Sequence, residues 1–132
     1  MESSAGVDVL VIDDNETHLK LTSIVLRSEG ITVAVAADAR QALESIERRR
    51  PSLVLVDLQL PDIGGVELTR QLKRDPRTRE IPVIALTALA MPSNREAALA
   101  AGCAEFLTKP FDTRLLGDVT RRYLEPGALD AE

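Results

Sequence analysis

The sequence predicts an α/β protein built from repeated strand–helix units around a parallel sheet. Five short apolar runs rich in β-branched residues recur along the chain, and helix-compatible segments separate them. The runs are residues 7–12, 31–35, 53–56, 82–86 and 106–108. Four of them are almost continuously apolar, as in parallel strands covered on both faces, whereas half-buried antiparallel strands alternate polar and apolar residues. The pattern therefore favours a doubly wound sandwich of three layers with five βα units.

The segments between the runs carry signals that start and stop helices. Polar residues stand where side-chain caps are expected, some with a partner three residues later: Asp14 or Asn15, Asp38 with Gln41, Ser93 with Glu96, and Asp112. Gly30 and Gly102 stand where a left-handed residue would end the first and fourth helices. Together with the five runs, these signals place the folded domain at residues 7–124.

Apolar spacing predicts which face of each helix is buried. The second and fifth helices have stripes at helical spacing, formed by Ala39, Ala42, Leu43 and Ile46, and by Leu115, Leu116, Val119 and Tyr123. In the first helix, we expect Leu21, Ile24 and Val25 to face the core. Leu19 and Leu26 would then lie on a second face that docks a partner. His18 lies nearby and is interpreted as a surface histidine, with no acidic partner at an obvious spacing.

Composition excludes several classes of protein. The chain has 132 residues, 45% of them apolar and 28% charged, which suits one globular domain of about 100–150 residues. No apolar run approaches the roughly 20 residues that span a bilayer. A net charge of −5 argues against direct nucleic-acid binding, and a single Cys with no secretory signal in residues 1–6 predicts a cytoplasmic protein. Residues 1–6 and 125–132 are expected to be a disordered N-terminus and a short polar tail.

Charged and hydroxyl side chains follow four of the predicted strands. Asp13 and Asp14 follow the first run, Asp57 the third, Thr87 the fourth and Lys109 the fifth. In an open parallel sheet, ligands bind beyond the carboxyl ends of the strands. Each residue alone has an ordinary explanation, such as a helix cap, a turn residue, a strand residue or a solvated loop charge. Their occurrence together on successive strand ends predicts a shared site.

Electrostatics restricts what this site can do. Three carboxylates and one Lys sum to −2, and a divalent cation would offset that charge. Oxygen ligands favour Mg²⁺ over Zn²⁺, which prefers His or Cys. Phosphoryl transfer to an Asp requires cations around the carboxylate. A divalent cation and a Lys would meet this need here, and Thr87 adds a hydroxyl.

These motifs resemble the receiver domains of bacterial two-component response regulators. The resemblance rests on VLVIDDNE, LVLVDLQLPDIGG, VIALTALAM and AGCAEFLTKPF, and it covers residues 7–124. The separations are 44 residues from Asp13 to Asp57, 30 from Asp57 to Thr87 and 52 from Asp57 to Lys109, as in that family. It implies a flavodoxin-like fold with strand order 2-1-3-4-5. It also implies a chemotaxis-regulator-like, single-domain signalling protein and not an enzyme.

The resemblance also implies a role for each residue of the site. Asp57 would accept a phosphoryl group from a phosphohistidine on a sensor histidine kinase or a histidine phosphotransfer protein. The Mg²⁺ ligands would be Asp13, Asp14, Asp57 and the backbone carbonyl of Gln59, with the first two acting directly or through water. Lys109 would pair with Asp57, and Thr87 and Phe106 would form the switch. Pro110 and Phe111 would join Leu19 on the partner surface, and output would pass to a downstream protein or through a phosphorylation-dependent dimer.

Some positions depart from the family pattern. Phe106 lacks the hydroxyl of the more common Tyr, so its position can be sensed by packing alone. Gly64 replaces a frequent Asp or Ser, which weakens the cap of the third helix and loosens the Gly64–Gly65 loop. Gln59 and Leu89 suggest an apolar rim above the phosphate.

Two other classes of protein share parts of this pattern. A phosphatase of the haloacid-dehalogenase type also uses an Asp nucleophile, Mg²⁺, a hydroxyl and a Lys, but it needs a second Asp where this chain has Gln59. It also needs a cap domain, for which the chain has no room. A flavin carrier with the same sheet needs a phosphate-cradling loop and stacking aromatic rings, and this chain has three aromatic residues in all.

Overall fold

The computed structural model describes residues 7–88, 91–108 and 113–124, and the predictions for residues 1–6 and 125–132 lie outside this part. Strands and helices alternate along the chain: β1 (Val7–Ile12), α1 (Glu16–Ser28), β2 (Val33–Ala36), α2 (Ala39–Arg48), β3 (Pro51–Asp57), α3 (Gly65–Arg74), β4 (Val83–Thr87), α4 (Pro92–Ala101), β5 (Glu105–Thr108) and α5 (Thr113–Leu124). The five strands form one parallel sheet in the order β2-β1-β3-β4-β5. The predicted fold class and strand order are confirmed.

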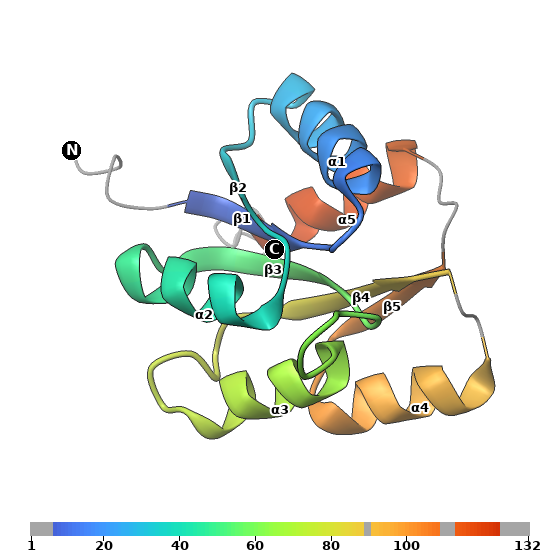
Figure 1. Cartoon of the computed structure of the whole chain (residues 1–132). Coiled ribbons are helices and arrows are strands. Elements are labelled where there is room, and N and C mark those ends of the chain that lie inside the picture. Colours follow the sequence, from blue (N-terminus) through green and yellow to red (C-terminus); the bar gives the residue numbers. More distant parts are fainter. Residues whose placement is uncertain (1–6, 89–90, 109–112, 125–132) are drawn as a thin grey trace, which may run out of the picture.

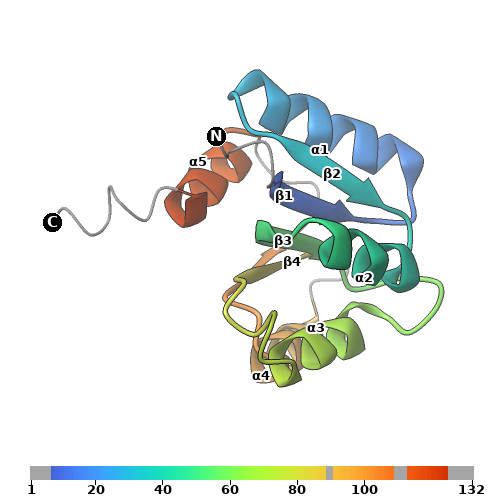
Figure 2. The same ribbon diagram turned by 90° about the vertical axis from the view of Figure 1, so that its left-hand side faces the viewer.

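Helices cover both faces of the sheet, which explains why the strands are apolar on both sides. Figure 1 shows α1 and α5 on one face and α2, α3 and α4 on the other, and Figure 2 shows the same three layers turned by 90°. Each face has its own apolar cluster. Leu26 and Leu116 belong to the α1/α5 side, and Ile46, Leu68 and Ala98 to the other side. The middle of the sheet is thus almost entirely buried, as in β3 and β4, where Ser52 alone is exposed, and the ends of the strands are left to carry polar groups.

The first helix presents a different face to the core from the one predicted. Leu26 is completely buried, and Leu19 and Val25 are partly buried against the same cluster. Leu21 and Ile24 are 52% and 64% exposed, so their assignment to the core was wrong. Apolar residues surround this helix on several sides, and its place over β1 and β2 decides which of them are covered. Leu19 still lines a groove beside β2 together with Lys20 and Ile24, so its role toward a partner stays a prediction.

The end of α1 shortens the strand that follows it. Gly30, at φ +82°, lets the Gly30 N–H donate to the Arg27 carbonyl and the Ile31 N–H donate to the Leu26 carbonyl. These are the two bonds of a Schellman motif, so Ile31 belongs to the helix end. The predicted strand at 31–35 therefore begins two residues later, at Val33. Gly102 ends α4 in the same conformation, as predicted.

The predicted helix starts were correct at two places and wrong at a third. Asn15 accepts a hydrogen bond from the His18 N–H, and Asp38 accepts one from the Gln41 N–H. The fourth helix begins at Pro92, one residue before the predicted cap Ser93, and its cap position is Met91 with no side-chain bond. Proline at the first helical position needs no N–H partner there, so the helix starts earlier than its polar residues suggest. Asp112 lies outside the described residues.

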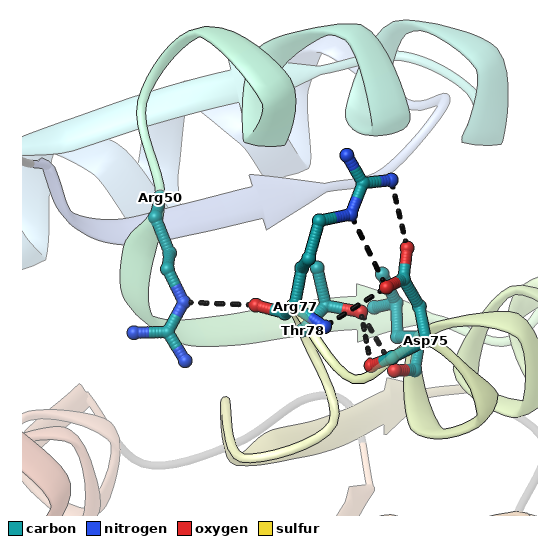
Figure 3. Close-up of polar contacts among 5 residues, drawn as sticks. Arg50, Asp75, Arg77 and Thr78 are labelled. Carbon is teal, nitrogen blue, oxygen red and sulfur yellow. Dashed lines mark hydrogen bonds and ion pairs between the residues drawn. The ribbon is translucent and has the colours of Figure 1, made fainter.

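The α3–β4 loop is fixed at the amino end of the sheet, away from the carboxyl ends of the strands. Thr78 Oγ1 donates to the Leu72 carbonyl at 2.7 Å, and Arg77 forms an ion pair with Asp75 at 3.0 Å (Figure 3). The Arg50 side chain, just after α2, donates to the Arg77 carbonyl at 3.2 Å. These bonds join the ends of α2 and α3 at the amino ends of the strands. The predicted functional residues lie at the opposite, carboxyl ends. In the described part of the chain, no helix is long and apolar enough to cross a membrane.

Candidate functional site

Strand register brings the predicted acidic residues together. Ile12 of β1 aligns with Val56 of β3, so the next residue on each strand places Asp13 beside Asp57. Asp57 in turn aligns with Leu86 of β4, so Thr87 lies one step further along the same edge. Period-two geometry and parallel pairing explain why residues so far apart in the chain meet here.

Three carboxylates converge at this edge. One oxygen from each of Asp13, Asp14 and Asp57 lies within 4.8 Å of the others. Asp13 and Asp57 are 4% and 7% exposed, whereas Asp14 is exposed to solvent. Burial reduces the solvation that would weaken repulsion between the negative groups. The site is therefore open on the side of Asp14 and closed beneath Asp13 and Asp57.

Backbone N–H groups orient the two buried carboxylates. The Asn15 N–H donates to Asp13 Oδ1 at 2.9 Å, and the Gln59 N–H donates to Asp57 Oδ1 at 2.9 Å. Each donor lies two residues after its acceptor, so the chain turns sharply beyond both strands. These bonds orient both carboxylates at the strand ends.

The chemistry of the donor set fits a hard divalent cation. All three converging side chains offer a carboxylate oxygen as the ligand atom. Such ligands favour Mg²⁺, which binds through one or two carboxylates and keeps several waters. Because Asp14 is exposed, the cluster is in contact with the solvent that would supply those waters.

An Asp14→Asn variant is expected to show how much repulsion among the three carboxylates lowers the stability of the protein. Without a divalent cation the variant should be more stable than the wild type by about 1 kcal/mol, because two repulsive pairs are removed. With saturating Mg²⁺ the order should reverse, because the wild type has the better cation site. Urea unfolding at constant ionic strength, with chelator and then with Mg²⁺, checks both signs. A variant that stays more stable in both conditions would contradict the assignment of Asp14 to the metal.

His18 is a member of the site that the sequence interpretation missed. Its Nδ1 lies 3.5 Å from Asp13 Oδ2, so the expectation of no acidic partner was wrong. Side chains in the first turn of a helix tilt toward its N-terminus, and His18 therefore reaches back to Asp13, two residues before the cap Asn15. That tilt is the signal that could have found the contact. His18 and the Asn15 N–H together hold both oxygens of Asp13.

A His18→Ala variant is expected to bind Mg²⁺ up to about tenfold more weakly, because residues that orient metal ligands contribute to affinity. His18→Gln, which can still reach Asp13, should recover part of the loss. Thr17→Ala is the matched control, since Thr17 is the exposed neighbour in the same helical turn. Isothermal titration calorimetry with Mg²⁺ measures all three. Equal affinity in His18→Ala and the wild type would remove His18 from the site.

Thr87 and Phe106 lie on neighbouring strands. Thr87 is the last residue of β4 and is completely buried, and it aligns with Thr108 at the end of β5. Phe106 is partly buried against the cluster that contains Val83 and Ala98. The strand positions of both residues agree with the prediction. Four of the residues predicted for the site and the surfaces around it lie outside the described part: Leu89, Lys109, Pro110 and Phe111.

Two glycines shape the loop between β3 and α3. Gly64 has φ +83° and occupies the cap position of α3 without a side-chain bond, as expected from the sequence. Gly65 lies so close to the end of β3 that an added Cβ would come within 2.6 Å of the Asp57 carbonyl oxygen. Its N–H donates to the Leu58 carbonyl at 3.0 Å. The start of α3 thus rests directly on the backbone of Asp57, which explains why a small residue stands there.

Comparison with known proteins identifies this arrangement. The family model described as the response regulator receiver domain matches residues 9–121. The chain is 34% identical over 116 residues to the polar-differentiation response regulator DivK of Brucella anthropi, covering 88% of this chain and 94% of the relative.

Solved structures give the same result. The receiver domain of a sensor histidine kinase from Pseudomonas aeruginosa, with a magnesium ion coordinated in its active-site cleft, has a TM-score of 0.82 and 37% identity. The match covers 91% of this chain and 98% of the Pseudomonas aeruginosa chain. Chemotaxis protein CheY4 of Vibrio cholerae has a TM-score of 0.84 and 28% identity, covering 91% and 100%. Receiver domains of two-component systems act with histidine kinases or phosphotransfer proteins. With a matching family model over most of its length and the acidic site at the expected edge of the sheet, the chain belongs to the response regulator receiver family and is a two-component signalling protein.

Proposed function

We propose that this receiver domain, with its boundaries at residues 7 and 124, accepts a phosphoryl group on Asp57 from a phosphohistidine of a kinase or phosphotransfer protein. The observation that carries the proposal is the position of Asp57. It ends β3, is held by the Gln59 N–H, and has carboxylate oxygens of Asp13 and Asp14 within 4.8 Å. A carboxylate placed beside a cation site and a hydroxyl has the parts that phosphoryl transfer needs.

The transfer itself exchanges one bond for another. An oxygen of the Asp57 carboxylate forms a bond to phosphorus as the bond between phosphorus and the donor imidazole nitrogen breaks. The nitrogen keeps the electron pair, and a proton on the other ring nitrogen makes the departing histidine a neutral imidazole. The product is an acyl phosphate on Asp57, and its hydrolysis by water returns the free carboxylate and inorganic phosphate.

Four residues would hold the metal ion. The carboxylates of Asp13, Asp14 and Asp57 and the backbone carbonyl of Gln59 are the proposed ligands. Bound Mg²⁺ would neutralise charge on the phosphoryl oxygens. The magnesium ion in the Pseudomonas aeruginosa receiver supports this choice, since that chain is 37% identical over most of its length. His18 orients Asp13 from the side of α1.

The remaining residues of the site respond to the phosphoryl group. Thr87 would donate its hydroxyl to a phosphoryl oxygen, and Lys109 would pair with Asp57 and then with the phosphoryl group. Movement of Thr87 would open space for the Phe106 ring, which shifts the surface formed by α4, β5 and α5. The covalent group can favour the second arrangement only as far as its contacts differ between the two states.

Output is proposed to be a protein–protein contact. The shifted surface would bind a downstream protein or a second copy of the chain, and Leu19, Pro110 and Phe111 would meet the phosphoryl donor. The likeness to DivK, named as a response regulator, supports a signalling role for a chain of this size. A cytoplasmic location stays a prediction from the sequence.

Intact-mass spectrometry tests the proposal. The protein is incubated with Mg²⁺ and a small acyl phosphate, and the expected product carries one phosphoryl group, which peptide mapping places on Asp57. The same incubation with a chelator should give no product. Rapid multiple turnover of unrelated phosphate esters, or modification at another residue, would refute the proposal.

A further inference from the structure

The one carboxylate of the β3–α3 loop makes contacts that the proposed chemistry does not use. Asp62 lies five residues after Asp57, in the loop of residues 58–64. Its Oδ1 accepts the Ala39 N–H and its Oδ2 accepts the Arg40 N–H, both at 3.1 Å. These two N–H groups belong to the first turn of α2. Asp62 therefore caps a helix from a loop that is 22 and 23 residues away in the chain.

The helix does not depend on Asp62 for its cap. Asp38, directly before α2, accepts the Gln41 N–H at 2.8 Å, and the Gln41 side chain accepts the Ala37 N–H at 2.9 Å. Two carboxylates thus stand at one helix N-terminus, where negative charge is favourable. Because Asp38 already supplies the local cap, the bonds of Asp62 have a second consequence, which is to fix the loop.

That loop carries a proposed metal ligand. Its first part is held by the Gln59 N–H on Asp57, and its end is held by the Gly65 N–H on the Leu58 carbonyl. Leu60 packs partly against the core, whereas Ile63 is 41% exposed. In the described residues, Asp62 is the point at which hydrogen bonds join the middle of this loop to another helix.

The Asp62 side chain is suited to stay ionised in this role. Burial opposes the charge, but the backbone N–H groups of Ala39 and Arg40, followed by those of Ile63 and Asp62 itself, lower the pKa of Asp62 below its ordinary value. A carboxylate that accepts several N–H bonds favours its charged form. Asp62 is therefore in its charged form at neutral pH.

We propose that Asp62 is a positioning residue that fixes the β3–α3 loop, and with it the Gln59 carbonyl, and so couples metal binding at Asp57 to the N-terminus of α2. This inference rests on the proposed function, in which the Gln59 carbonyl is a metal ligand. By linkage, the coupling is reciprocal. A cation that orders the loop also strengthens the contact of Asp62 with Ala39 and Arg40, and loss of that contact lowers the affinity for the cation. It gives α2 a connection to the site that does not pass through Thr87 and Phe106.

Two matched variants separate this role from simple helix capping. Asp62→Ala and Asp38→Ala each remove one carboxylate from the N-terminus of α2, but only Asp62→Ala releases the loop. Mg²⁺ affinity is measured by titration calorimetry, and amide hydrogen exchange is followed at Ala39 and Arg40 with and without Mg²⁺. We expect Asp62→Ala to bind Mg²⁺ about tenfold more weakly. Mg²⁺ should slow exchange at Ala39 and Arg40 in the wild type and not in this variant.

The control defines the result that would overturn the inference. Asp38→Ala should keep Mg²⁺ affinity within about twofold of the wild type, although loss of a cap costs about 1 kcal/mol of stability. Wild-type affinity in Asp62→Ala, or an equal loss in both variants, would reduce Asp62 to a structural cap. Asp62→Asn keeps the side-chain volume and one acceptor oxygen. It should show an intermediate loss, and it replaces Asp62→Ala if that variant does not fold.

Mg²⁺ titration together with the intact-mass measurement separates this inference from the proposed function. If the wild type binds Mg²⁺ and gains a phosphoryl group while Asp62→Ala behaves identically, the coupling is wrong and the proposed function stands. If the wild type neither binds Mg²⁺ nor accepts a phosphoryl group, the proposed function fails as well, together with the metal site on which the coupling depends.

Discussion

An Asp57→Asn variant is expected to gain no phosphoryl group under conditions in which the wild type gains one. The amide oxygen of Asn is neutral and a far weaker nucleophile than a carboxylate, and the amide nitrogen lone pair is delocalised. Because Asn has nearly the same shape, its oxygen can still accept the Gln59 N–H, so the fold should be kept. Intact mass after incubation with Mg²⁺ and an acyl phosphate measures the loss.

The same variant should respond weakly to Mg²⁺. A cation at 100 times its Kd stabilises the wild type by about 2.7 kcal/mol, which raises the melting temperature by several degrees in a domain of this size. Removing one of three converging carboxylates should reduce this increase to less than half. Asp75→Asn is the control, because that carboxylate pairs with Arg77 at the other end of the sheet. A phosphoryl group on Asp57→Asn, or an equal loss of the Mg²⁺ response in Asp75→Asn, would contradict the assignment.

The acidic site was predictable because it depends on a repeating geometry. Parallel strands that are apolar on both faces end at one edge, so residues that follow the runs had to meet there. The structure places Asp13, Asp57 and Thr87 in adjacent register, as the strand ends required. No tertiary detail was needed for this part beyond the choice of a parallel sheet.

Features that depend on a single tertiary contact were not predictable in the same way. The first helix has apolar residues on several sides, and its spacing could not show that Leu26 would be buried and Ile24 exposed. The bonds of Asp62 to the first turn of α2 join two segments that are 22 and 23 residues apart in the chain. Hydrophobic periodicity contains no information about such pairs, because polar side chains find partners only after the elements have packed.

The closeness of Gly65 to the end of β3 leads to a second prediction of large effect. Gly65→Ala is expected to destabilise the protein by about 1–3 kcal/mol, because the new Cβ would meet backbone atoms that cannot rotate away. It would come within 2.6 Å of the Asp57 carbonyl oxygen and 2.8 Å of Leu58 Cα. Helix propensity alone predicts the opposite sign, since Ala is favoured over Gly by up to about 1 kcal/mol in a helix interior. Urea unfolding therefore decides which effect dominates.

The clash should also damage the site, because α3 and the end of β3 must move apart to accept the methyl group. Mg²⁺ affinity and the rate of phosphoryl gain should both fall in Gly65→Ala. Gly30→Ala separates these effects from lost stability. Gly30 has φ +82° with open space around its Cβ position, so its variant has backbone strain of about 1–2 kcal/mol and no clash near Asp57. We expect Gly30→Ala to lose stability while keeping wild-type Mg²⁺ affinity. If Gly65→Ala were as stable as the wild type and bound Mg²⁺ equally well, the contact between α3 and Asp57 would not constrain the site.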